Sequence, residues 1–160
     1  MAGAILQRHA VQVPQEGIVV FLVGMRINQL WNVRQWMPVM GAMRGMLDEL
    51  AQPSNPGVLG PSRIYVSGRT IQVQQYWRSL EALEFYARSK DHAHFAAWRA
   101  FYRRAKETDA VGVYHETYVV PPRGGDALYV KMPRHGLGSV DIQPSSASAV
   151  EPNSSQTDPA

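Results

Sequence analysis

Gly17-Ile-Val-Val-Phe-Leu-Val-Gly-Met25 is the stretch that decides the fold. A short apolar run rich in Val, Ile and Phe predicts a buried β-strand. Successive side chains of a strand point to opposite faces of its sheet. Both sets are apolar here, with Ile18, Val20 and Leu22 on one face and Val19, Phe21 and Val23 on the other. Such a strand needs cover on both sides of the sheet.

The segments that follow this strand alternate between helical and strand patterns. Asn28 is a candidate helix cap, and Pro38 divides the next apolar stripe because proline disrupts a helix interior. Ser79 is a candidate cap for a short helix, and Asp91 for a second helix with an aromatic stripe. The predicted elements are a helical turn at 29–36, a helix at 38–51, a hairpin of strands 63–67 and 70–77, short helices after Ser79 and Asp91, and strands at 111–120 and 126–131.

This order predicts an α+β fold of the ferredoxin-like split βαβ type, with a four- to five-stranded antiparallel sheet. Helices of such a domain cover one face of the sheet and leave the other bare. A bare face conflicts with the two-sided apolar strand at 17–25. We therefore expect a homodimer in which the two sheets pack face to face.

Three regions follow from composition. Residues 1–14 are expected to form an N-terminal arm, residues 15–138 the folded domain, and residues 139–160 a disordered acidic tail rich in Ser and Pro. The apolar run at 17–25 is too short to span a bilayer, and residues 1–14 lack the apolar core of a signal peptide. We expect a cytoplasmic protein with no membrane partner.

The composition excludes several kinds of chemistry. The chain of 160 residues has no cysteine, which rules out disulfides, cysteine-based zinc sites and thiolate nucleophiles. No P-loop, dinucleotide-binding spacing or Gly-x-Ser-x-Gly elbow is present. The net charge is +3, but the basic residues are scattered, so we expect no nucleic-acid partner.

Histidine is left as the best candidate base or ligand. His115 lies in the strand at 111–120, on the same face as Val113 and Val119, where it is either a hydrogen-bonded core residue or a site residue. His92 and His94 are two residues apart and do not share a helix face, so we expect no metal site. One of the two imidazoles would still suffice as an axial ligand of haem.

Several aromatic residues are candidates for an apolar cavity that takes a small apolar molecule. A packed aromatic core would give the same pattern, so both readings stay open. The residues are Trp36, Tyr76, Trp77, Trp98 and Tyr114.

Six segments together resemble a known family. They are Gly24-Met-Arg-Ile-Asn28, Trp36-Met-Pro-Val39, Gln75-Tyr-Trp-Arg-Ser79, His94-x-x-Ala97-Trp-Arg-x-Phe101, Val111-Gly-Val-Tyr-His-Glu-Thr-Tyr118 and Lys131-Met-Pro-Arg-His-Gly-Leu-Gly138. In this order they resemble a monooxygenase-like family, related to the antibiotic-biosynthesis monooxygenases within the dimeric α+β barrel superfamily. The resemblance implies the same ferredoxin-like fold and face-to-face dimer.

The resemblance implies several activities. Relatives oxidise aromatic polyketides without a cofactor, dehydrate aldoximes with haem, degrade haem, or have no known chemistry. A histidine on the helix after the third strand ligates iron in the haem-degrading relatives, and His94 lies in a similar element. Lys131, Arg134 and His135 depart from the family's usual closing motif. If that segment covers the pocket, substrate choice differs.

The activity we expect is a small-molecule monooxygenase that uses no cofactor and acts on a polyketide- or terpenoid-like metabolite. His115 is the expected base, with His94 as a second catalytic candidate, while Trp77, Arg99 and Arg26 position the substrate or stabilise negative charge. Glu116 does not orient His115, because neighbouring strand residues point to opposite faces. The alternatives are a haem enzyme that uses His94 and a non-catalytic ligand-binding barrel.

Overall fold

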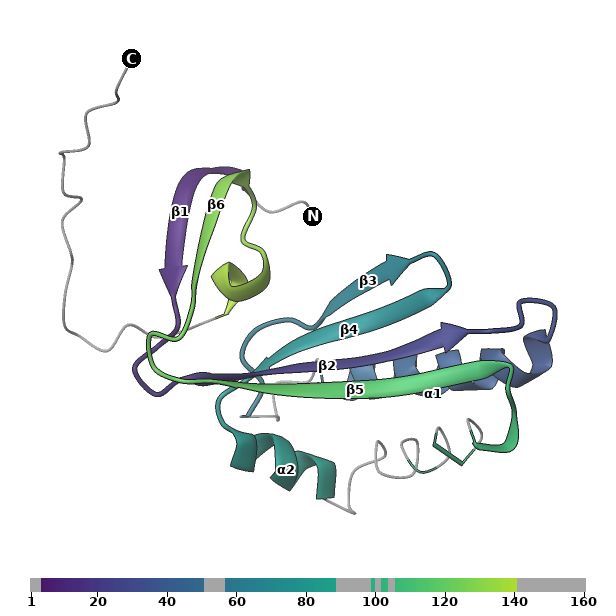
Figure 1. Cartoon of the computed structure of the whole chain (residues 1–160). Coiled ribbons are helices and arrows are strands. Elements are labelled where there is room, and N and C mark those ends of the chain that lie inside the picture. Colours follow the sequence, from purple (N-terminus) through teal and green to yellow (C-terminus); the bar gives the residue numbers. More distant parts are fainter. Residues whose placement is uncertain (1–3, 51–56, 89–98, 100–101, 104–105, 141–160) are drawn as a thin grey trace, which may run out of the picture.

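The computed structural model describes residues 4–50, 57–88, 99, 102–103 and 106–140. The elements whose bounds are described are six strands, two helices and one short 3₁₀ helix (Figure 1). Their bounds are β1 Leu6–Gln12, β2 Ile18–Ile27, α1 Val33–Leu50, β3 Arg63–Ser67, β4 Thr70–Trp77, α2 Leu80–Arg88, β5 Val111–Val120, β6 Asp126–Met132 and η1 Gly136–Ser139.

Four of the strands form an antiparallel sheet in the order β3-β4-β2-β5. The strand predicted at 17–25 is β2, and it lies in the interior of this sheet between β4 and β5. The register places Val23 opposite Val73 on one side and opposite His115 on the other. The predicted ferredoxin-like α+β fold is confirmed, with strands β3, β4 and β5 at or within a residue of their expected bounds.

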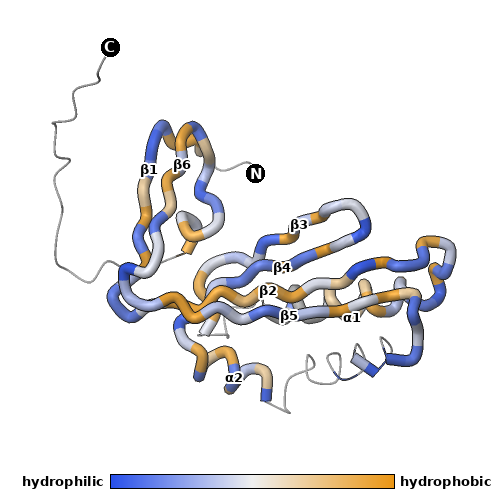
Figure 2. The backbone as a smooth tube through the Cα atoms, viewed as in Figure 1, coloured by the Kyte–Doolittle hydropathy of each residue, from blue (hydrophilic) through white to orange (hydrophobic). Residues whose placement is uncertain are grey.

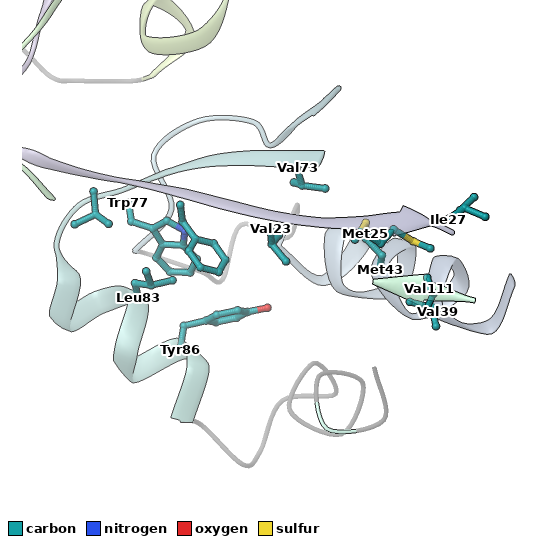
Figure 3. Close-up of a cluster of buried hydrophobic side chains, with 12 residues drawn as sticks. Val23, Met25, Ile27, Val39, Met43, Val73, Trp77, Leu83, Tyr86 and Val111 are labelled. Atoms are coloured by element: carbon teal, nitrogen blue, oxygen red, sulfur yellow. The ribbon is translucent and has the colours of Figure 1, made fainter. Parts of the chain in front are cut away.

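Both helices cover one face of this sheet (Figure 1). Figure 3 shows Val23, Met25 and Trp77 directed toward side chains of the helices, among them Met43 of α1 and Leu83 of α2. Met25 and Trp77 are both completely buried there. The odd-numbered residues of β2 therefore form the core between sheet and helices.

The other face of the sheet is covered at one end only. β1 and β6 pair with each other in a separate two-stranded sheet, which rises from this side (Figure 1). A small second core lies beneath it, and includes Ile18, Tyr76, Leu137 and Val140. The strand expected at 126–131 thus exists as β6, but it pairs with a strand inside the expected arm rather than joining the main sheet. Residues 141–160, most of the expected tail, lie outside the described residues.

The division expected at Pro38 is wrong. Helix α1 runs through Pro38 without interruption. Proline lacks the amide hydrogen that would bond to the carbonyl of Arg34, so the helix loses one bond near its beginning. Burial of Val39 and Met43 against the sheet offsets this loss.

The expected cap of the second helix is confirmed. The Ser79 hydroxyl accepts a hydrogen bond from the amide of Ala82 at 3.2 Å, at the start of α2. The helix expected after Asp91 lies mostly outside the described residues, although Arg99, Tyr102, Arg103, Lys106 and Glu107 are helical. Among the described residues, no helix has the length and apolar character needed to span a membrane. Figure 2 shows the hydrophobic stretch along β2 that organises the sheet.

Replacing Met25 with alanine is expected to lower the free energy of unfolding by about 2–5 kcal/mol, because it leaves a cavity in a packed core. Val66→Ala, at a side chain that is 70% exposed, is the control and should change it by less than about 0.5 kcal/mol. Urea denaturation of the two variants measures the difference. Equal effects would contradict the assignment of Met25 to the packed core.

Candidate functional site

A cavity of about 720 Å³ lies between the sheet and the helices. This volume is in the range of small-molecule sites. Three parts of the chain form its walls: β2 and β5 of the sheet, helix α2, and four helical residues, Arg99, Tyr102, Arg103 and Lys106. The lining residues are Phe21, Leu80, Leu83, Glu84, Ala87, Arg99, Tyr102, Arg103, Lys106, His115 and Thr117.

His115 reaches this cavity because of the register of β5. It lies opposite Val23, whose side chain points to the helix-covered face, so His115 points to the same face. β5 is at the edge of the sheet, and the His115 side chain is exposed rather than packed in the core. Of the two readings that the sequence left open for His115, the cavity-lining position is the one observed.

A hydrogen bond joins His115 to Tyr102. The Tyr102 hydroxyl and the Nδ1 atom of His115 are 2.7 Å apart, and their rings meet edge to face. Burial raises the pKa of Tyr102 above its ordinary value, so the phenol stays neutral at physiological pH. When Nδ1–H donates to this hydroxyl, the lone pair of the imidazole is on Nε2. Tyr102 can thereby fix the tautomer of His115 that acts as a base.

The cavity has two chemically different walls. Phe21, Leu80, Leu83 and Ala87 provide an apolar surface from β2 and α2. The helical residues that line the cavity include three cations: Arg99, Arg103 and Lys106. Glu84 is the single carboxylate among the lining residues, and it forms an ion pair with Arg88 at 2.9 Å.

Two aromatic residues expected at the site have structural roles instead. Trp77 is completely buried, and its Nε1–H donates to Gln75 Oε1 at 3.1 Å. Trp36 packs against the main core, and its indole N–H donates to the carbonyl of Leu30 at 3.2 Å. Neither lines the cavity.

Three further candidates lie on the opposite face of the sheet from His115. Tyr76, Tyr114 and Arg26 occupy even-numbered register positions, which alternate with those of the helix-covered face. The Tyr114 hydroxyl donates to Gln72 Oε1 at 2.7 Å, and the Tyr76 hydroxyl accepts from Gln74 Nε2 at 2.6 Å. Burial raises the pKa of both phenols. These positions belong to a separate surface and not to the cavity.

The closing segment with the departures Lys131, Arg134 and His135 also lies away from the cavity. Arg63 donates to the carbonyl of Arg134 at 3.1 Å, and Tyr65 bonds to His135 Nε2 at 3.2 Å. Arg63 and Tyr65 lie on the same face as Tyr114. This segment therefore does not cover the cavity, which was the condition for expecting it to alter substrate choice.

Of the expected site residues on the helical segment, only Arg99 is described, and it lines the cavity. His92, His94 and Trp98 lie outside the described residues. Within the part of the chain that the structure describes, no three His, Asp or Glu side chains gather closely enough to hold a metal ion.

Sequence reasoning missed Tyr102, Arg103 and Lys106 as site residues. A signal was present, since Arg99, Arg103 and Lys106 are four and three residues apart, which places them on one face of a helix. The three cations do not form a consecutive run, so their shared face is visible only from the helical spacing.

A family model described as monooxygenase af470-like matches residues 18–137. The chain belongs to this family. The match includes β2, the cavity and the closing segment. None of the curated proteins compared with the sequence matches it significantly.

Two aldoxime dehydratases of known structure share the fold. An aldoxime dehydratase, OxdRE in complex with butyraldoxime, is 17% identical with a TM-score of 0.67 over 88% of this chain and 41% of its own. Another aldoxime dehydratase is 19% identical, with a TM-score of 0.66 over 89% of this chain and 45% of its own. SnoaB, a cofactor-independent oxygenase from Streptomyces nogalater, is 8% identical, with a TM-score of 0.42 over 64% of this chain and 91% of its own. This chain spans less than half the length of the two dehydratases.

Proposed function

We propose that this protein is a small-molecule monooxygenase that uses His115 as its base and needs no cofactor. The observation that carries the proposal is the exposed His115 on the cavity wall, hydrogen-bonded to a neutral Tyr102 at 2.7 Å. Membership of a monooxygenase-like family supports it. The apolar wall suits a polyketide- or terpenoid-like substrate with an acidic C–H or O–H group.

The reaction converts a substrate methylene and O₂ into a carbonyl and water. His115 removes a proton and leaves a carbanion or enolate, which gives one electron to O₂. The substrate radical and superoxide then combine into a peroxide, and the proton held by His115 returns to it. Loss of water from the hydroperoxide yields the carbonyl. Arg99 lies on the same wall and would stabilise the negative charge that develops.

His115→Gln is expected to lower kcat by about 10²–10⁴-fold, because it removes the base. Tyr102→Phe should lower kcat by about tenfold, because it deletes one orienting hydrogen bond. Oxygen uptake with a panel of anthrone-like and terpenoid substrates measures both.

The matched controls lie on the other face of the sheet. His135→Gln removes another imidazole, and Tyr118→Phe removes another hydrogen-bonded phenol, which donates to Glu116. Both controls should retain turnover. Wild-type turnover by His115→Gln would refute the base assignment, and no uptake with any substrate would favour the non-catalytic binding barrel.

The second candidate is a haem enzyme. The fold shared with the aldoxime dehydratases and the donor set of the cavity favour it, since an imidazole can ligate iron and Arg99, Arg103 and Lys106 can pair with propionates. Bound haem would supply an iron centre that activates the substrate. His94, the expected axial ligand, is outside the described residues.

Hemin titration followed by absorbance decides between the candidates. The haem candidate predicts a Soret band that His94→Ala abolishes, whereas the cofactor-free candidate predicts no specific band. His115→Ala serves as the comparison variant, because it removes an imidazole from the cavity.

We further propose that two copies pack through the face of the sheet that the helices leave open. Tyr118 of β5 is 52% exposed on that face, and Val20, opposite it in the register, is only half-buried. Tyr118 bonds to Glu116, and Tyr114 bonds to Gln72, so the two phenols that β5 presents on this face are already hydrogen-bonded within it. Such pairing lowers the desolvation cost of covering the face.

Neighbouring residues of β5 provide a matched test. Tyr118→Glu should convert the dimer to a monomer, because it places a second carboxylate beside Glu116 in the interface. Val119→Glu, at a residue 62% exposed on the helix-covered face, should leave the dimer intact. Sedimentation equilibrium should give twice the chain mass of 17.8 kDa for the wild type and for Val119→Glu. A monomeric wild type would refute the proposal.

A further inference from the structure

We propose that the cavity selects an amphipathic carboxylate: a molecule whose apolar body lies on α2 and β2 and whose anionic group pairs with Arg103 and Lys106. This inference concerns the substrate class of the same cavity, so it rests on the proposed function for its biological meaning. It does not depend on whether the bound molecule is oxidised.

The apolar half of the site comes from two elements. Phe21 is buried beneath the cavity, and its ring is 6.1 Å from that of His115. Leu80, Leu83 and Ala87 are three and four residues apart on α2, so they form one continuous stripe along the wall. A flat or aliphatic body placed here would lie beside the His115 imidazole.

The charged half comes from one helical face. Arg99, Arg103 and Lys106 have the spacing of residues that share a face, and Tyr102 lies among them. Four charged side chains line the cavity, and three of them are cations. Glu84, the remaining one, is held by Arg88 at 2.9 Å, which reduces its influence on the other charges.

Arg103 and Lys106 are the cations available to a ligand. The nearest carboxylate to Arg103 among the described ion pairs is Glu107, at 3.9 Å, and both side chains are largely exposed. Such an exposed pair is weak and is easily exchanged for another anion. Lys106 forms no ion pair within the described parts of the chain. Two cations at the edge of an apolar cavity attract an anion more strongly than the same charges on a convex surface.

Matched pairs of probes isolate the charge. 2-Naphthoate and 2-naphthamide have the same flat body, and octanoate and octanamide have the same aliphatic body, but only the acids are charged. Calorimetric titration at low salt should show that at least one acid binds about tenfold more tightly than its amide. The preference should shrink at high salt, because the cations are solvent-exposed.

Two double variants locate the effect. Arg103→Gln with Lys106→Gln should reduce the preference to within about twofold while leaving the binding of the amide unchanged. Arg8→Gln with Arg123→Gln removes the same charge from exposed positions outside the cavity and should keep the full preference. Circular dichroism verifies that each variant is folded.

The results separate this inference from the proposed function. Equal affinity of acid and amide in both pairs, no binding of either acid, or an equal loss in the control variant would overturn the inference. A His115→Ala variant that keeps the preference but has no turnover would support both proposals. A preference without turnover in the wild type would support the carboxylate site and refute the monooxygenase. Hemin also carries carboxylates, in its propionates. A competition experiment, in which hemin is added to the protein loaded with 2-naphthoate, distinguishes the two ligands: displacement of 2-naphthoate shows that hemin takes the same site, and its retention shows a site for the small acid alone.

Discussion

The pairing of β2 with β4 on one side and β5 on the other is the constraint on which the rest of the structure depends. It fixes which side chains of three strands share a face, because residues opposite each other in the register point the same way. Met25 and Val23 face the helices and are almost completely buried. A slip of one residue would turn this core toward solvent and carry His115 to the wrong face.

The same constraint explains why the cavity lies where it does. β5 extends past the helix-covered core at the edge of the sheet, so its side chains meet fewer neighbours than those of β2. His115 and Thr117 are therefore exposed while Phe21, opposite Thr117, is buried. α2 and the helical residues around Tyr102 complete the walls. The cavity lies where the edge strand β5, α2 and the helical residues around Tyr102 meet.

Much of the fold was predictable because local patterns carry it. Three such patterns act over only a few residues: the apolar run of β2, the Gly68-Arg69 turn and the Ser79 cap. Strands β3, β4 and β5 have the expected bounds. The helix break predicted at Pro38 was wrong, because tertiary burial of Val39 and Met43 outweighs one lost helix hydrogen bond. β1 was missed because its partner, β6, is more than 100 residues away in the chain and its burial alternates only weakly.

The site was less predictable because it depends on how separate elements meet. His115 could be assigned to a face from sequence alternation, but whether its side chain packs in the core or lines a cavity depends on which helical residues lie against that face. Trp77 and Tyr102 look alike as aromatic residues near a predicted site. One is in the interior of the core, and the other reaches His115 from a helix. Only the contact between elements separates these roles.

Alternation along β5 also places the two functions that we propose for this strand on separate faces. His115 and Thr117 face the cavity, whereas Tyr114, Glu116 and Tyr118 face the open side of the sheet. The Tyr114 and Tyr118 hydroxyls on the open side are hydrogen-bonded to polar side chains on that side, while the His115 imidazole is hydrogen-bonded to Tyr102 at the cavity wall. Because the side chains of β5 that face the cavity alternate with those that face the open side, a change on the proposed dimer face need not disturb the proposed base. The register of β5 against β2 therefore lets this edge strand present a ligand-binding face and a separate face for a second chain.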